Sequence, residues 1–209
     1  MAASAFIAAN LPLRPVPGLS GISIHTAVSG SGLRRLAAGR NPYWAWCWAG
    51  GLALAQHLAA RPETVAGKGV LDLGAGSGLV GIAAAKAGAR AVLAVDVDED
   101  AVAAIELNAR ANRVSLAVLH DDILDDVPPP VDVALVGDLF YDRDVAARVT
   151  RFLDACVAAG TRVYVGDPFR AFLPRERLNL IASYATRDFG LRDDEEMTAA
   201  VFSFVANSA

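Results

Sequence analysis

The chain has 209 residues, of which 54% are apolar, and a formal net charge of −4. This composition fits one folded α/β domain with a sizeable core and excludes a disordered chain. The mild acidity argues against a protein that holds nucleic acid by neutralising phosphates, and every long apolar run is broken by charge or glycine, which argues against a membrane span. The two cysteines, Cys47 and Cys156, form no metal or disulfide motif, which favours a cytoplasmic protein without a metal site.

The first sixty residues contain few regular patterns. Residues 1–20 are rich in alanine, proline and serine, and we expect an extended arm there. Residues 21–28 alternate between apolar and polar side chains, which predicts a strand or a short hairpin arm. An aromatic cluster at residues 43–48 holds all three tryptophans of the chain, and a helix is expected to follow from Gly50 to Ala60.

From residue 68 onward, strand-like and helix-like segments alternate, which predicts right-handed βαβ units and a parallel sheet. Strands are expected near 69–73, 91–95, 115–119, 132–137 and 161–166, and helices near 78–87, 99–111, 143–159 and 174–182. After Ser183 the pattern predicts a final pair of strands with no helix between them, so that the last strand is antiparallel. We therefore expect an N-terminal arm with a short strand segment, residues 1–40, followed by a single domain, residues 41–209.

The most informative segment is Val70–Gly78, in which an apolar strand runs directly into a turn with three glycines. A helix-like stretch follows, and a second strand ends at Asp96. Glycines allow a ligand to approach the backbone closely, and a carboxylate at the end of the second strand is well placed to bind ribose hydroxyls. The pair predicts a nucleoside-binding site; the alternative is a glycine turn that only reverses the chain.

The spacing of the glycines bears on which nucleoside binds. A dinucleotide site uses G-x-G-x-x-G, whereas this chain has G-x-G-x-G with Asp72 two residues before the first glycine. A carboxylate there would repel a pyrophosphate but could hold an ammonium group. S-adenosylmethionine (SAM) carries a ribose and an α-ammonium but no phosphate. The segment resembles the first motif of the SAM-dependent methyltransferases, which implies a Rossmann-like α/β fold with a mostly parallel seven-stranded sheet and an antiparallel last strand.

Acidic residues stand at the ends of five predicted strands: Asp72, Asp96, the pair Asp121-Asp122, Asp138 and Asp167. Aspartate also caps helices, which is an alternative role for some of them, above all Asp167. The methyltransferase resemblance implies that Asp96 binds the ribose hydroxyls, that Asp122 accepts from the adenine amino group and that Asp72 meets the α-ammonium. It also implies cofactor contacts along the turn, from the backbone of Gly74, Ala75, Gly76 and Gly78.

Two further features are candidates for the reaction itself. The aromatic cluster is interpreted as a hydrophobic lid on the core, or as placing Trp48 against the cofactor, since aromatic faces attract sulfonium and ammonium cations; the two interpretations are compatible. Asp138 and Tyr141 form a D-x-x-Y pattern after the fourth predicted strand, where a substrate and the transferable methyl would meet. A carboxylate at that point can orient a lysine ammonium and help it lose its proton, so that Asp138 and Tyr141 are the predicted catalytic residues. The alternative for Tyr141 is a buried ring that caps the turn.

Four segments in order resemble the electron transfer flavoprotein β-subunit lysine methyltransferases, within the D-x-x-Y group: residues 41–51, 70–78, 137–141 and 165–168. The resemblance implies a SAM-dependent protein-lysine N-methyltransferase that acts on that β subunit. One departure is Ala49, where proline is expected. Ribosomal-protein lysine methyltransferases usually carry an asparagine-centred motif after the fourth strand, so Asp138 argues against them.

Other functions remain alternatives at this point. They are a methyltransferase for a ribosomal-protein lysine, a small-molecule N-methyltransferase, and a SAM-fold module without activity. A small substrate would need a lid, and the chain offers no insertion between strands, which favours a protein substrate at an open cleft. We also expect a monomer, and a solvated acidic run at 193–196 that could attract a lysine-rich partner.

Overall fold

The computed structural model describes residues 3–36, 41–186 and 196–206, so Asp193, Asp194 and Glu195 of the acidic run lie outside the described residues. Its centre is a seven-stranded sheet. In spatial order the strands are β5 (Ala117–His120), β4 (Ala91–Asp96), β3 (Gly69–Leu73), β6 (Val133–Gly137), β7 (Arg162–Asp167), β9 (Met197–Phe204) and β8 (Leu178–Thr186). Strands β3 to β7 are parallel, and β9 runs antiparallel to both of its neighbours. The expected fold class is confirmed.

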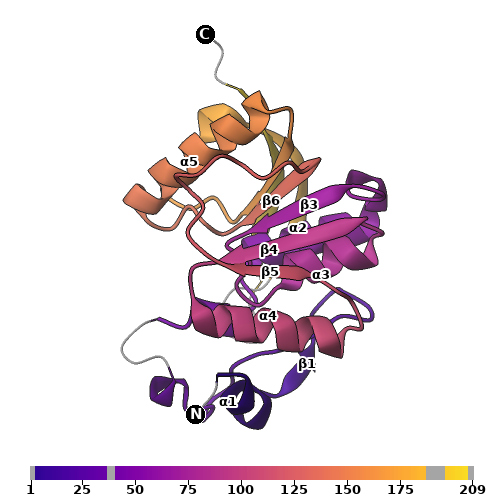
Figure 1. The fold of residues 1–209 in the computed structure, drawn as a ribbon, viewed down its shortest axis with the longest axis vertical. Coiled ribbons are helices and arrows are strands. Elements are labelled where there is room, and N and C mark those ends of the chain that lie inside the picture. Colours follow the sequence, from indigo (N-terminus) through magenta and orange to yellow (C-terminus); the bar gives the residue numbers. More distant parts are fainter. Residues whose placement is uncertain (1–2, 37–40, 187–195, 207–209) are drawn as a thin grey trace.

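Helices cover both faces of this sheet, as Figure 1 shows for α5 on one side and for α2 and α3 on the other. Their bounds are Ala49–Ala60 for α2, Leu79–Lys86 for α3, Glu99–Ala111 for α4 and Arg143–Ala158 for α5. The two cores follow from strand alternation, because successive side chains point to opposite faces. Val70 packs in the core beneath α2 and α3, whereas its neighbour Leu71 packs beneath α5. The central strands β3 and β6 are thus buried on both faces, as in parallel sheets, whereas the edge strands β5 and β8 are largely exposed.

The N-terminal segment differs from the expected extended arm. Residues Ala3–Asn10 form helix α1, and Phe6 and Ile7 pack in one cluster with Ala101 and Ala104 of α4. The helix forms because prolines begin only at Pro12, so that alanine-rich residues before it are free to be helical. Strands β1 (Leu13–Pro15) and β2 (Ser23–His25) then pair in a small antiparallel sheet, which confirms a strand within residues 21–28.

The helix expected near 174–182 is wrong. A 3-10 turn, η4 (Arg175–Arg177), leads directly into the edge strand β8, which pairs with β9 along its length. Leu178 and Leu180 face Phe204 and Phe202 of β9, so cross-strand pairs replace the helical face that the apolar spacing suggested. The final strand pair itself is confirmed. Other 3-10 turns are η1 (Leu33–Arg35), η2 (Tyr43–Ala45) and η3 (Pro62–Thr64). Within the described ranges, no helix is long and apolar enough to cross a membrane.

The first turn of α2 lies directly on the ends of β6 and β7. A Cβ atom built on Gly50 would stand 2.2 Å from the carbonyl oxygen of Gly166, and one built on Gly137 would stand 3.0 Å from the Cα of Gly51. Backbone therefore packs on backbone at this point, because no side chain separates the helix from the strands. This contact fixes where Trp48, the residue before α2, meets the end of the sheet.

We predict that Gly50→Ala destabilises the protein by about 1–3 kcal/mol, since the new methyl group must displace backbone atoms. The matched control is Gly51→Ala in the same helical turn, where the added Cβ would meet Val80 at an ordinary 3.7 Å. That variant should keep or raise stability by roughly 0.5–1 kcal/mol, because alanine favours the helix. Urea unfolding of both variants tests the packing; equal stabilities would contradict it.

Candidate active site

A cavity of about 670 Å³ opens at the carboxyl ends of the parallel strands. The chain passes from β3 through β4 to β5 on one side and then returns to β6 on the other, so the cavity lies where the strand order reverses. Open α/β sheets bind ligands at that point. Seven of the predicted site residues line it: Trp48, Gly74, Gly76, Asp96, Asp122, Asp138 and Tyr141. Residues from five separate parts of the chain are thereby brought together.

The glycine turn and Asp96 form one hydrogen-bonded unit. Gly74 and Gly76 have φ angles of 65° and 55°, a conformation that side chains disfavour. The backbone N–H of Gly76 donates to Oδ2 of Asp96 at 2.8 Å, and the N–H of Asp98 donates to Oδ1 at 2.9 Å. Burial raises the pKa of Asp96, and these two backbone donors oppose that shift. The carboxylate is therefore fixed in the cavity wall, with its remaining lone pairs as acceptors for hydroxyl groups.

Asp72 lies deeper than the cavity wall. It is buried, and Oδ2 accepts a hydrogen bond from the backbone N–H of Gly81 in α3 at 2.7 Å. Burial raises its pKa to about 7, and the Asp96 charge adds to that shift. Asp72 and Ala75 line a second pocket of about 50 Å³, which also contacts Gly74, Gly76 and Asp138. The two pockets therefore adjoin, and a cationic group in the smaller one would find a carboxylate there.

Gly78 contacts neither pocket. It precedes α3 with a φ of 79°, and a Cβ atom on it would stand 3.2 Å from the Cγ2 of Ile105. In this structure its visible role is close packing of the turn against α4. The cofactor contact expected for Gly78 stays a prediction, and the position of Gly78 outside both pockets does not support it.

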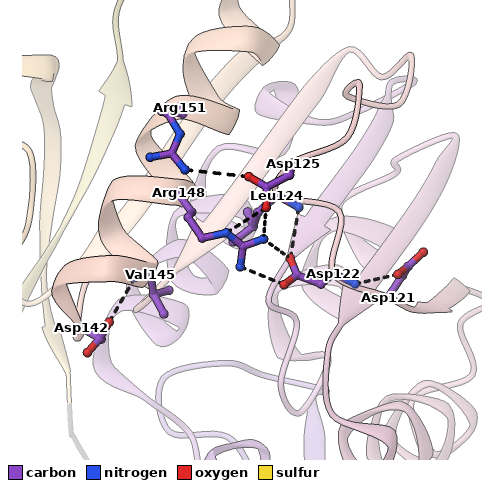
Figure 2. Close-up of polar contacts among 8 residues, drawn as sticks. All are labelled: Asp121, Asp122, Leu124, Asp125, Asp142, Val145, Arg148 and Arg151. Atoms are coloured by element: carbon purple, nitrogen blue, oxygen red, sulfur yellow. Dashed lines mark hydrogen bonds and ion pairs between the residues drawn. The ribbon is translucent and has the colours of Figure 1, made fainter.

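Asp122 enters the cavity wall as part of an ion-pair network between the segment after β5 and helix α5 (Figure 2). Arg148 donates to both carboxylate oxygens of Asp122, at 2.9 and 3.1 Å, and also to Asp125 at 2.5 Å. This hydrogen bonding lowers the pKa of Asp122 and keeps it ionised. The network fixes the orientation of Asp122, whose lone pairs beyond those used by Arg148 could accept from an amino group.

Asp138 and Tyr141 follow β6 on the other side of the cavity. Asp138 adopts a φ of 59°, a left-handed conformation that aspartate tolerates better than most residues. Its Oδ2 accepts from the backbone N–H of Gly51 at 2.7 Å, and its Oδ1 pairs with Arg170 at 2.7 Å. The Tyr141 ring is half-exposed and lies 5.5 Å from the ring of Tyr43. Tyr141 is therefore not the buried ring of the alternative interpretation.

The aromatic cluster divides into two roles. Trp44 is buried with Phe6 and Ile7 and closes a small core. Trp48 lines the cavity, and its Nε1 donates to the Tyr43 carbonyl at 2.7 Å. Trp44 thus packs in a core, although it also contacts the cavity, whereas a cofactor contact of Trp48 stays a prediction.

The donor set fits a SAM-like ligand on three observations. An anchored carboxylate, Asp96, faces the cavity beside a glycine turn; apolar side chains, among them Val97 and Ile123, line the wall next to it; and a buried carboxylate, Asp72, stands in the adjoining small pocket. These match a ribose, a flat adenine and an α-ammonium in turn. Within residues 3–36, 41–186 and 196–206, no cluster of three or more metal-ligating side chains occurs.

Sequence reasoning missed three side chains of the site: Tyr43, Arg148 and Arg170. Tyr43 belongs to the aromatic cluster, so its composition was a usable signal. The arginines gave none, because Arg148 pairs with a residue 26 positions away and Arg170 with one 32 positions away. Among the acids, Asp167 does not line the cavity, and its Oδ1 accepts from the backbone N–H of Arg170 at 2.6 Å.

Comparison with known proteins places this architecture in a family. The model of the ribosomal protein L11 methyltransferase family matches residues 56–136, less than half of the chain. The solved structure of magnesium protoporphyrin IX methyltransferase from Synechocystis PCC 6803, with bound SAM, superposes with a TM-score of 0.55 at 17% identity over 75% of this chain and 78% of that one. That likeness supports the fold.

Curated relatives are more similar in sequence. The electron transfer flavoprotein beta subunit lysine methyltransferase of Rattus norvegicus is 39% identical over 78% of this chain and 67% of its own length. The Homo sapiens protein of the same name is 43% identical over 62% of this chain, and the match spans 50% of its own length. The chain belongs to the family of electron transfer flavoprotein beta subunit lysine methyltransferases.

Proposed function

We propose that this protein is a SAM-dependent protein-lysine N-methyltransferase whose substrate is the β subunit of electron transfer flavoprotein. The observation that carries the proposal is the position of Asp138. It lies in the wall of the same cavity as Asp96, but after β6 rather than β4. One cavity thus offers Asp96 as a hydrogen-bond partner for the ribose and Asp138 as a carboxylate for the cationic group that receives the methyl. The substrate name follows from the relatives.

On this proposal Asp96 binds the ribose hydroxyls, Asp122 accepts from the adenine amino group, and the turn at Gly74, Ala75 and Gly76 runs beneath the methionine portion. Asp72 meets the α-ammonium from the small pocket. Bound SAM would supply a methyl group on a sulfonium, which needs only an in-line lone pair from the acceptor. Orientation therefore accounts for much of the rate enhancement that the protein can provide.

The chain's own residues must deliver that lone pair. A lysine side chain has a pKa of about 10.4 in water, so it arrives as an ammonium without a lone pair. Asp138 is held at the end of β6 by the Gly51 N–H, and it can orient the ammonium and promote loss of a proton. The rings of Tyr141, Tyr43 and Trp48 form the aromatic wall beside it, at 5.5 and 5.9 Å between successive ring centres. Such faces favour an alkylammonium chain.

The element order favours a protein over a small molecule, because the described segments between the strands of the sheet contain no inserted domain that could form a lid. We also propose that the enzyme is cytoplasmic and monomeric and that it binds neither nucleic acid nor membrane. A ribosomal-protein lysine is the second candidate, supported by the family model that matches residues 56–136. That match ends before Asp138. It therefore includes the residues proposed to bind SAM, such as Asp96, but not those proposed to bind the target lysine.

The ribose assignment predicts that Asp96→Ala weakens binding of S-adenosylhomocysteine (SAH) by about 1–3 kcal/mol, since polar groups of ligand and turn lose their partner. Asp126→Ala is the control of equal charge, because Asp126 is exposed and outside the cavity. It should change the binding free energy by less than about 0.5 kcal/mol. Isothermal titration calorimetry measures both variants. Unchanged SAH affinity in Asp96→Ala, or NAD binding to the wild type, would contradict the assignment.

The proposed contact of Asp72 with the α-ammonium predicts a pH dependence. With a pKa of about 7, Asp72 is mostly protonated at pH 6 and ionised at pH 8. SAH carries the α-ammonium and should bind about tenfold more tightly at the higher pH, because the ionised carboxylate attracts it. Asp72→Asn should bind SAH with little change across this range. If the SAH affinity of the wild type does not change with pH, the α-ammonium does not bind at Asp72.

The acceptor assignment predicts that wild-type enzyme and SAM add methyl groups to lysine of the flavoprotein β subunit. Asp138→Asn should slow this transfer by roughly 10²–10⁴-fold, the usual contribution of a positioned acid or base, while SAH still binds. Tyr141→Phe keeps the ring and should cost about tenfold or less, the size of one neutral hydrogen bond. Asp144→Asn, at an exposed position in the first turn of α5, controls for charge.

Mass spectrometry of the intact β subunit and its peptides is the measurement. An unmodified β subunit, together with methylation of another protein or of a small amine, would overturn the substrate. Near wild-type turnover in Asp138→Asn would show that Asp138 has a structural role only.

A further inference from the structure

Arg170 occupies the position that the proposed function gives to the target lysine. Its Nη2 lies 2.7 Å from Oδ1 of Asp138, and its Cζ lies 5.8 Å from the centre of the Trp48 ring. The side chain is 22% exposed and lines the cavity, whereas that of Asp138 is 10% exposed. A carboxylate and an aromatic face are also the partners expected for a lysine ammonium. A resident cation thus holds the place of the substrate cation.

A counterion at Asp138 has a clear physical reason. A carboxylate removed from water must be paired, or its charge is strongly unfavourable. The Gly51 N–H supplies one hydrogen bond to Asp138, but a target lysine is present only during turnover. Arg170 supplies a permanent positive charge, and it comes from the loop directly after β7. An incoming ammonium must therefore either displace this guanidinium or approach a second positive charge.

The same loop offers Arg170 another acceptor. Asp167 is fully buried, and while its Oδ1 accepts from the Arg170 backbone N–H, its Oδ2 has no hydrogen-bond partner among the described residues. The pKa of Asp167 is raised to about 6, chiefly by burial; the charge of Asp138 contributes to this rise, and the backbone N–H and the charge of Arg170 oppose it. The three side chains therefore form one electrostatic cluster. A buried carboxylate oxygen without a partner is uncommon and calls for an explanation.

We propose that Arg170 is an exchangeable counterion that leaves Asp138 for the open Oδ2 of Asp167 when the target lysine ammonium enters. The inference rests on the proposed function of Asp138 as the lysine-binding carboxylate. One cation replaces another at Asp138, so no covalent bond changes and no proton is required from outside. Arg170 is a positioning residue in this scheme. It keeps Asp138 paired and oriented in the free enzyme, and it restricts entry to groups that can compete for a carboxylate.

The exchange can be observed without turnover, by NMR of the arginine side chains in ¹⁵N-labelled enzyme saturated with SAH. The probe is n-butylammonium, which carries the chemistry of a lysine side chain, and the Arg170 signals are assigned by their loss in Arg170→Lys. We expect them to shift saturably as the amine is added, while the signals of Arg177, which pairs with Asp154, stay constant. Arg170 signals that remain unchanged throughout the titration would overturn the exchange.

Asp167→Asn tests the second acceptor, because asparagine keeps Oδ1 for the Arg170 N–H and replaces only Oδ2. We expect this variant to bind n-butylammonium roughly tenfold more weakly, the effect of one charge-assisted hydrogen bond. Its SAH affinity and its cooperative unfolding should match the wild type. Equal amine affinity in Asp167→Asn and wild type would show that Arg170 is a fixed support of Asp138.

Kinetics with the flavoprotein β subunit give an independent test. If Arg170 competes with the target lysine, Arg170→Gln should lower KM for the protein substrate by about fivefold or more, whereas Asp167→Asn should raise it. Arg143→Gln, which removes an arginine stacked on Phe172 outside the cavity, should leave KM unchanged. A raised KM in Arg170→Gln contradicts the exchange. A wild-type enzyme that fails to methylate the β subunit contradicts the proposed function instead, and the NMR titration still decides the role of Arg170.

Discussion

The close approach of helix α2 to the ends of β6 and β7 is the constraint on which the site depends. Gly50 and Gly166 touch through their backbones, and this allows the Gly51 N–H to reach Asp138. A side chain at either glycine would separate the helix from the sheet by the thickness of a methyl group. Trp48, which immediately precedes the helix, would then move away from the carboxylate. Because no side chain separates α2 from the sheet, Trp48 and the carboxylate of Asp138 lie in the wall of the same cavity.

The acids of the site lower the stability of the empty protein at neutral pH. Burial raises the pKa values of Asp72, Asp96 and Asp167, so each favours its protonated form in the folded state. For such a group, the stabilising contribution is complete below the unfolded pKa of about 3.9 and is lost as the pH rises through the folded pKa. For Asp72 that loss accumulates from about pH 3.9 upward and is complete once the pH exceeds the folded pKa of about 7. Hydroxyl and ammonium groups of a ligand would offset this cost, which couples binding to stability.

The local parts of this structure could be predicted from the sequence. The strand, glycine turn, helix and second strand from Val70 to Asp96 are encoded by neighbouring residues, and their order along the chain implies a parallel sheet with its acids at one edge. Helix α1 was missed because the proline content of residues 12–17 was extended to the residues before it. The first part of strand β8 was missed because Leu178, Leu180 and Ile181 fit a helical face as well as an edge strand, and only pairing with β9 decides between them.

The ion pairs of the site could not be predicted in this way. Arg148 and Arg170 find their carboxylates only after the sheet has brought distant strand ends together, and a lone arginine in a loop or on a helix gives no local signal. The acids had a signal because each lies at or near the carboxyl end of a strand, whereas the arginines follow no such rule. Charge complementarity across the cavity is thus a property of the tertiary structure, even though every acid in it is visible in the sequence.

The cavity has two halves with different demands on the chain. In the half that we propose binds the nucleoside, from Val70 to Asp122, backbone turns and acids would suit any ligand with the same sugar and base. The ribosomal protein L11 methyltransferase family model matches the chain only as far as residue 136. The acceptor half begins two residues later. There Asp138 is held in a left-handed conformation by the Gly51 N–H and by Arg170 before any acceptor arrives. The Asp138 carboxylate is already desolvated and oriented. A methyl acceptor therefore needs a positive charge and a narrow chain to take the place of the Arg170 guanidinium. Selection for a lysine can therefore reside in this half alone, while the nucleoside half stays common to methyltransferases with other acceptors.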